Sequence, residues 1–188
     1  MISTLRWSGV GRGNGVLSRP MAIWQYDLRV IPRSGLSQWL STDVPIMPSQ
    51  VDNESLEQTD WWKLVKPESV SQVLSTLLPQ RPVGWDARTV SWGSEDGHRI
   101  DLVRDGGRVE ELLVRIDVRS LLDGFLPRLL GALEDLGCLL VTETRRIIEP
   151  NAEALWNELR QSSAWRYVED PEGLVATLSA EIAKKRRH

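Results

Sequence analysis

The chain has one cysteine and two histidines among 188 residues, and this scarcity excludes several classes of protein. Cys138 cannot form a disulfide within the chain, and a zinc site built from several thiolates is excluded with it. No apolar run approaches the roughly 20 residues of a membrane-spanning helix, and the N-terminus lacks the apolar core of a signal peptide. These absences predict a cytoplasmic protein with no membrane partner.

The net charge of −3 hides a separation of charge along the chain. Seven basic residues lie in the first 20 positions and the last five, where no acidic residue accompanies them. Residues 21–183 therefore carry a net charge of −10, since removing seven positive charges from −3 leaves that value. Such an acidic body disfavours nucleic acid and favours a protein partner with a basic surface.

The local patterns predict a single domain after a short leader. Residues 1–20 are rich in glycine, serine and arginine without periodicity, which predicts a disordered leader. Residues 21–188 contain no internal repeat and are long enough to bury one core. We therefore expect a single α+β domain over residues 21–188.

Hydrophobic periodicity predicts a mixed order of strands and helices. The predicted elements are a strand at 22–31, a long irregular segment at 32–66, a helix at 67–78, three strands at 88–94, 98–104 and 109–118, a helix at 123–136 with Asp123 as N-cap, a strand at 138–148, and two helices capped by Asn151 and Asp170. This order predicts an α+β fold, in which an antiparallel-rich sheet carries helices mainly on one face. A ferredoxin-like sandwich is one arrangement that satisfies it.

Turn residues predict the register of the three consecutive strands. A three-residue loop at 95–97, with Gly97 in the left-handed conformation, would pair Trp92 with Ile100. A second loop at 106–108 would pair Leu102 with Leu112, and Arg104 with Glu110. This register collects the apolar side chains on one face of the sheet.

His98 is the candidate centre of a catalytic or metal site, in the pattern Asp96, His98, Asp101. Strand side chains alternate between faces, so His98 and Asp101 are expected to point away from each other. A first-row metal ion needs three or four convergent ligands, which this spacing does not supply. The sequence therefore favours a structural hairpin without metal or cofactor, and a metal-dependent hydrolase is the alternative.

Two acidic features suggest a surface for a protein partner. The segment 41–62 has acidic residues but no basic ones, and it ends in two tryptophans that either anchor a partner or pack into the core. The outward face of the predicted sheet also carries charges, whose mixed signs are typical of a solvated surface. The candidate partner-binding residues are Asp52, Glu54, Glu57, Asp60, Trp61, Trp62, Asp101, Glu111, Arg115 and Asp117.

The stretches "WQYDLRVIPRSGL", "DWW", "DGHRIDLVRDGGRVEELLVRIDVRS" and "YVEDPEGLVATL" resemble small bacterial α+β proteins. Some of these are similar to compact, acidic immunity proteins that neutralise polymorphic toxins. The resemblance implies an immunity-type inhibitor and identifies no functional residue. The uncompensated acid at 41–62, together with the lack of a catalytic constellation, predicts a non-enzymatic protein that occludes a basic protein partner. A structural domain that associates with copies of itself is a further alternative.

Overall fold

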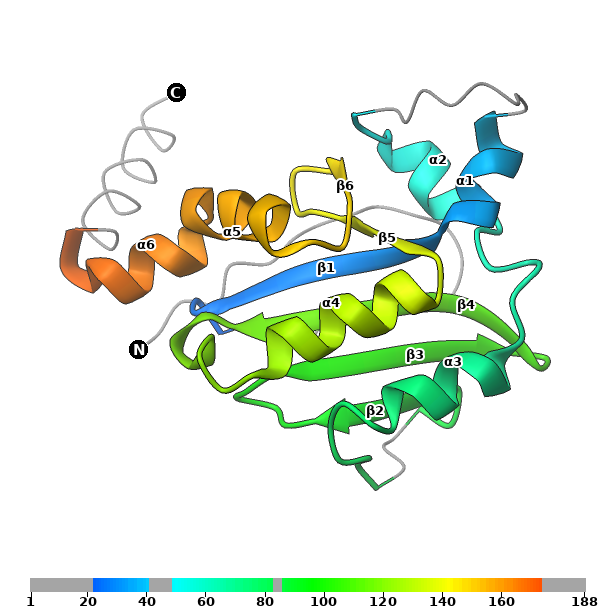
Figure 1. Cartoon of the computed structure of the whole chain (residues 1–188), viewed down its shortest axis with the longest axis horizontal. Coiled ribbons are helices and arrows are strands. Elements are labelled where there is room, and N and C mark those ends of the chain that lie inside the picture. The colour runs from blue at the N-terminus through cyan, green and yellow to red at the C-terminus, as the bar shows by residue number, and fades with distance from the viewer. Residues whose placement is uncertain (1–21, 41–48, 83–85, 174–188) are drawn as a thin grey trace, which may run out of the picture.

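The computed structural model describes residues 22–40, 49–82 and 86–173 (Figure 1). The predicted leader at 1–20 and most of the last predicted helix lie outside these residues. Residues 171–173 are helical, and the Asp170 carboxylate accepts a hydrogen bond from the Gly173 N–H at 3.0 Å, as expected of an N-cap.

The strands form one six-stranded sheet in which all neighbours are antiparallel, in the order β2-β3-β4-β1-β5-β6. The strands are β1 (Gln25–Pro32), β2 (Thr89–Gly93), β3 (Arg99–Asp105), β4 (Arg108–Asp117), β5 (Cys138–Val141) and β6 (Ile147–Ile148). The helices are α1 (Arg33–Leu40), α2 (Asn53–Gln58), α3 (Pro67–Leu74), the short 3-10 helix η1 (Val118–Ser120), α4 (Phe125–Asp135), α5 (Ala152–Gln161) and α6 (Ser163–Glu169). The predicted α+β class is confirmed.

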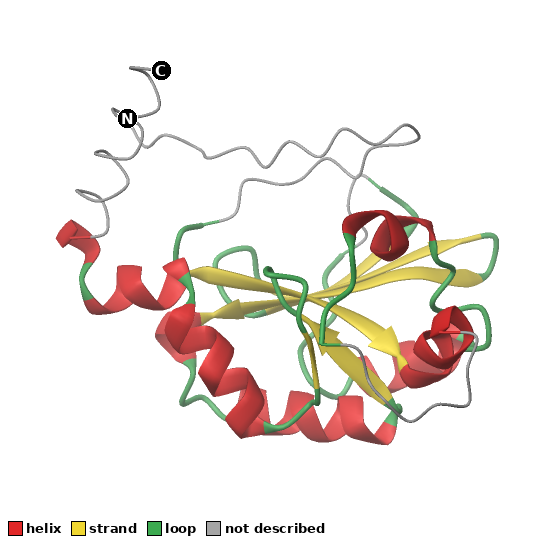
Figure 2. Ribbon diagram, turned by 90° about the horizontal axis from the view of Figure 1, so that it is seen from above, coloured by secondary structure: helices red, strands yellow, loops and turns green. Residues whose placement is uncertain are grey.

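Without the two edge strands, the order of ferredoxin-like domains, β-α-β-β-α-β, is followed by β1, α3, β3, β4, α4 and β5. β1 and β3 run in the same direction with β4 between them, and β4 and β5 do so with β1 between them. β2 and β6 extend the two edges of this unit. Figure 1 shows α3, α4 and α5 in front of the sheet, and Figure 2 shows most of the helical turns gathered on one side of the twisted strands.

The core lies between the apolar sheet face and these helices. Leu129 and Leu133 of α4 are fully buried against Leu28, Ile100 and Val114 in one continuous cluster. Burying each such side chain stabilises the fold by about 1.5–3 kcal/mol. The α4 leucines recur every three or four residues, which is the spacing that places them on one helix face.

The predicted pairing of the first hairpin is confirmed, but its left-handed residue is not Gly97. Trp92 lies opposite Ile100, and Gly93 adopts φ = 91°. A Cβ atom on Gly93 would lie 2.1 Å from the His98 carbonyl oxygen, so this position excludes any side chain. The close approach of β2 to the start of β3 therefore selects glycine here.

The second hairpin has a tighter turn than predicted. Leu102 pairs with Leu112 as expected, but Asp105 lies opposite Arg108, with Gly106 and Gly107 both at positive φ. This two-residue turn matches the twist of the flanking strands. An irregularity after Val103 then places Arg104 opposite Val109 instead of Glu110.

Other boundaries also differ from the predictions. The segment 32–66 contains α1 and α2, and the predicted strand 138–148 is a hairpin of β5 and β6 that turns through Arg145 at φ = 65°. α6 was not predicted, although Ser162 caps it through the Trp165 N–H. α4 begins one residue later than predicted, because its N-cap is Gly124 rather than Asp123, and the Asp123 carboxylate accepts a hydrogen bond from the Phe125 N–H. Helix α3 ends at Leu74, earlier than predicted.

Candidate functional site

Trp61 and Trp62 belong to the core. Both rings are buried, and the Trp61 Nε1–H donates to the Leu56 carbonyl oxygen at 3.1 Å. The Trp39 ring of α1 packs against Trp61 with a centroid distance of 5.7 Å. In this conformation neither tryptophan offers anchor area to a partner, and both instead hold the acidic segment against the domain.

Four of the segment's acidic residues are described, Asp52, Glu54, Glu57 and Asp60; they lie on and around α2, and all four are exposed. Asp52 is the N-cap, and its carboxylate accepts from the Ser55 N–H at 2.8 Å and from the Ser55 hydroxyl at 2.7 Å. These hydrogen bonds lower the pKa of Asp52, so the group is ionised at neutral pH. Glu54 accepts from Gln58 at 3.3 Å, and Asp60 follows the helix. Asp43 lies outside the described residues.

Arg29 of β1 joins α2 to the sheet. Its guanidinium donates to the Leu56 carbonyl oxygen at 3.1 Å and forms an ion pair with Glu57 at 3.2 Å. It also forms an ion pair with Glu111 of β4. Burial raises the pKa of Glu111 although Arg29 opposes the shift. The two predicted acidic features are therefore parts of one surface, which sequence reasoning had treated separately.

We call the outward side of the sheet the charged sheet face, made of Asp27, Arg29, Arg99, Asp101, Glu111 and Arg115. The Arg99 side chain is only 3% exposed and pairs with Asp101 at 2.8 Å and with Glu95 at 3.1 Å. Arg115 pairs with Asp27 of β1 at 2.9 Å. Asp101 also accepts a hydrogen bond from Ser91 of β2. Asp27 and Glu111 are thus neutralised by arginines of the neighbouring strand, and Asp101 by Arg99 of its own strand. Together with the Ser91 hydrogen bond, these contacts join β1 to β4 and β2 to β3.

Asp117 lies at the end of β4 in a separate, buried cluster. Burial alone would raise the pKa of its carboxyl group, but hydrogen bonds from the Arg119 guanidinium and backbone N–H outweigh this effect and lower the pKa. Asp117 is therefore a structural cap of η1, not a free carboxylate on the charged sheet face.

His98 is buried and acts as a structural connector in this conformation. Its Nδ1 accepts from the Asp117 N–H at 3.1 Å, so the proton of the neutral ring must lie on Nε2. Nε2 lies 3.2 Å from both the Ser120 carbonyl oxygen and the Asp123 carboxylate. The ring stacks on Phe125 at a centroid distance of 4.3 Å. These contacts fasten the start of β3 to the loop before α4.

The structure does not bring the proposed catalytic residues together. Asp101 lies on the charged sheet face, bonded to Arg99, whereas His98 points into the opposite side of β3. Among the residues that the structure describes, no three histidine, cysteine or acidic side chains are grouped so that they could hold a metal ion. Cys138 is buried, and burial raises its pKa to about 12, so it is a poor nucleophile.

An apolar groove lies between α4 and α5, and sequence reasoning did not identify it. Its volume is about 310 Å³, and it is lined mainly by Leu121, Leu122, Leu126, Pro127, Leu130 and Trp156. The sequence does carry a sign of this groove. Leu121 and Leu122 precede Asp123, so the apolar stripe of the following helix does not account for them.

Within the described ranges, no helix combines the length and the hydropathy that crossing a membrane requires. Comparison with known proteins found no matching family model, no similar curated protein and no similar solved structure.

Proposed function

We propose that this chain is a non-enzymatic binding protein that engages a basic protein surface through the acidic surface around α2. We define this acidic surface as Asp52, Glu54, Glu57 and Asp60. The observation that supports the proposal is that all four carboxylates are exposed, while only Glu57 has an ion-pair partner among the described residues. The concrete form suggested by the sequence resemblance is an immunity-type inhibitor of a toxin.

The acidic surface is held in place before any partner arrives. Arg29 ties the Leu56 carbonyl to the sheet, Asp52 caps α2, and the buried Trp61 and Trp62 anchor the residues that follow. Such preorganisation reduces the ordering that binding would otherwise require. The exposed carboxylates would steer a basic partner and speed its association, most strongly at low salt.

Asp101, Glu111 and Arg115 would contribute less to binding. They are partly buried, and each is already paired with an opposite charge. Because neighbouring arginines offset the acids, the charged sheet face presents a smaller negative field to a partner than α2 does. We therefore assign the leading role to the acidic surface.

The test is charge reversal that leaves the core intact. Glu54→Lys with Asp60→Lys alters two exposed residues, and Glu134→Lys with Asp135→Lys makes the same charge change on α4. Each protein is used to capture partners from the cells that produce it, and association rates of captured partners are measured against salt concentration. We expect a basic partner that the first variant loses and the α4 control retains. Capture that both variants support equally would contradict the proposal.

A further inference from the structure

The α4–α5 groove ends in an unusually exposed apolar side chain. Leu122 is 96% exposed, although it stands at the rim of a groove whose walls are leucine, proline and tryptophan side chains. A large apolar side chain beside an apolar groove is typical of a protein interface, because a second molecule can bury both.

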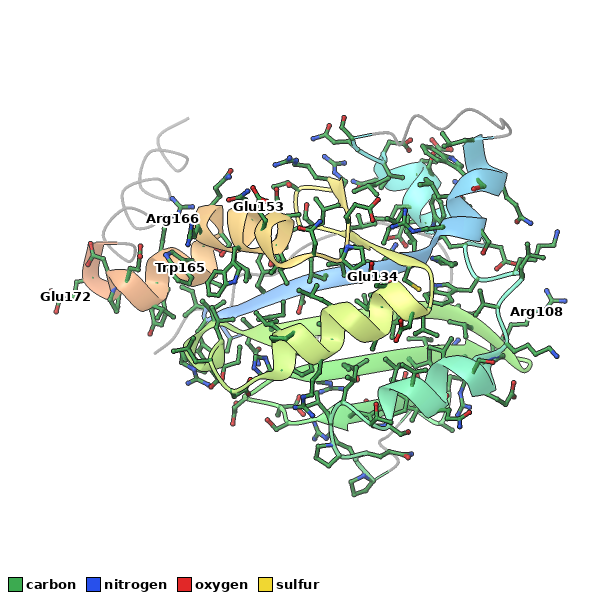
Figure 3. All side chains as sticks on the ribbon, viewed as in Figure 1. Arg108, Glu134, Glu153, Trp165, Arg166 and Glu172 are labelled. Carbon is green, nitrogen blue, oxygen red and sulfur yellow. The ribbon has the colours of Figure 1, made fainter. Side chains whose placement is uncertain are left out.

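α5 carries both signs of charge beside this groove. Glu153, Trp156 and Arg160 are spaced at i, i+3 and i+7, which places them on one face of the helix. Glu153 and Arg160 are exposed, and the Arg160 guanidinium lies 5.7 Å from the centroid of the Trp156 ring. Figure 3 shows Glu153 projecting from α5, with Trp165 on the adjoining α6; the Trp165 ring meets Trp156 edge-on at 5.7 Å.

These features are complementary to themselves. In a two-fold dimer the same patch meets its own copy, so each contact occurs twice. If α5 crosses its copy antiparallel with the axis beside Trp156, Glu153 of one subunit faces Arg160 of the other, and the reverse pair forms as well. The acidic surface around α2, by contrast, has no such balance of charge. The mixed charges beside the groove therefore favour a second copy of this chain over a purely basic partner.

We propose that this chain forms an isologous dimer through the α4–α5 face, with Leu122 of each subunit packed against the apolar groove of the other. Glu153 and Arg160 pair across the two-fold axis beside Trp156. The acidic surface around α2 lies away from α5 in the fold, so the dimer does not depend on the proposed partner binding (Figure 1).

The test is analytical ultracentrifugation of the full chain over a wide concentration range, with Glu153→Arg and Arg160→Glu as separate variants. Each substitution sets two pairs of like charges against each other in a homodimer, so each should raise the dimer dissociation constant about tenfold or more. An equimolar mixture restores both opposite-charge pairs in the heterodimer and should restore association. A mixture that associates no better than the single variants would overturn the proposal, as would a wild-type chain that stays monomeric.

Leu122→Asp provides an independent arm, with Leu64→Asp as its matched control. Both leucines are exposed, at 96% and 64%, so neither substitution opens a cavity in the core. We expect Leu122→Asp to abolish the dimer and Leu64→Asp to leave it unchanged, with circular dichroism verifying the fold of each. Equal loss of association in both variants would place the contact elsewhere and overturn the assignment.

Discussion

Replacing Arg99 by methionine should destabilise the domain far more than the same change at an exposed arginine. The Arg99 side chain is 3% exposed, and its removal leaves Asp101, which is 19% exposed, without its nearest positive charge. Breaking a buried ion pair costs about 3–5 kcal/mol. Arg99 lies directly opposite Arg115, so losing their repulsion returns up to about 1 kcal/mol. We therefore expect Arg99→Met to lower the free energy of unfolding by about 2–4 kcal/mol.

Arg33→Met is the matched control, because Arg33 pairs with Glu149 while the two side chains are 47% and 41% exposed. An exposed ion pair contributes about 0–1 kcal/mol, so this variant should stay close to wild type. Urea unfolding followed by tryptophan fluorescence measures both, since the buried Trp92 on β2 reports on the same sheet. Equal losses in the two variants would refute the argument that burial decides the value of these pairs.

The interaction energy between Arg99 and Asp101 can be isolated by combining Arg99→Met with Asp101→Asn. If Arg99 and Asp101 act as a pair, the double variant should be more stable than the sum of the single losses predicts, by about 1–2 kcal/mol. Additive losses would mean that the guanidinium acts through Glu95 and Ser91, which also contact it.

Two further predictions concern acid stability and the first hairpin. Because the folded-state pKa of Asp117 is lowered below the ordinary value of 3.8, its stabilising effect is present above that value and lost as pH falls through the lower one. Urea unfolding from neutral pH to below 3.8 should show a shallower acid decline for Asp117→Asn than for wild type; identical slopes would exclude Asp117 as the cause. Gly93→Ala should cost at least about 2 kcal/mol because its Cβ would clash with the His98 oxygen, whereas Gly131→Ala, in open space on α4, should gain about 1 kcal/mol. Thermal unfolding of the two glycine variants measures both changes in stability. Equal effects of the two substitutions would contradict the argument from the Cβ clash.

The register of the sheet could be predicted because strand side chains alternate with a period of two. A one-residue shift of the first hairpin would move Trp92 to the face opposite Ile100 and Leu102, whereas the predicted loop keeps them together, and the structure has the predicted pairings of Trp92 with Ile100 and of Leu102 with Leu112. The same alternation predicts that His98 and Asp101 point to opposite faces, as they do in the structure. Helix N-caps were also predicted where the cap is a local hydrogen bond, as at Asn151.

The charge of the acidic segment could be predicted from the sequence, but its conformation could not. Its charges are visible in the sequence, whereas the burial of Trp61 and Trp62 depends on Trp39, on the Leu56 carbonyl and on the sheet below. Tryptophan is common both in cores and at interfaces, so its residue type does not decide between them. The link between α2 and the charged sheet face also depends on long-range contacts, which here are those of Arg29 with Leu56, Glu57 and Glu111.

By itself the sequence determined the α+β class, the pairing of the apolar residues in β2, β3 and β4, and the acidity of the body, because these follow from local periodicity and from a count of charges. Tertiary structure decided which charges are neutralised and which apolar side chains stay exposed. Arg99 and Leu122 illustrate the reason: a charged side chain is buried and an apolar one is exposed, since burial depends on the elements that pack around a residue. The α4–α5 groove could appear only once the β5–β6 hairpin had brought these two helices side by side.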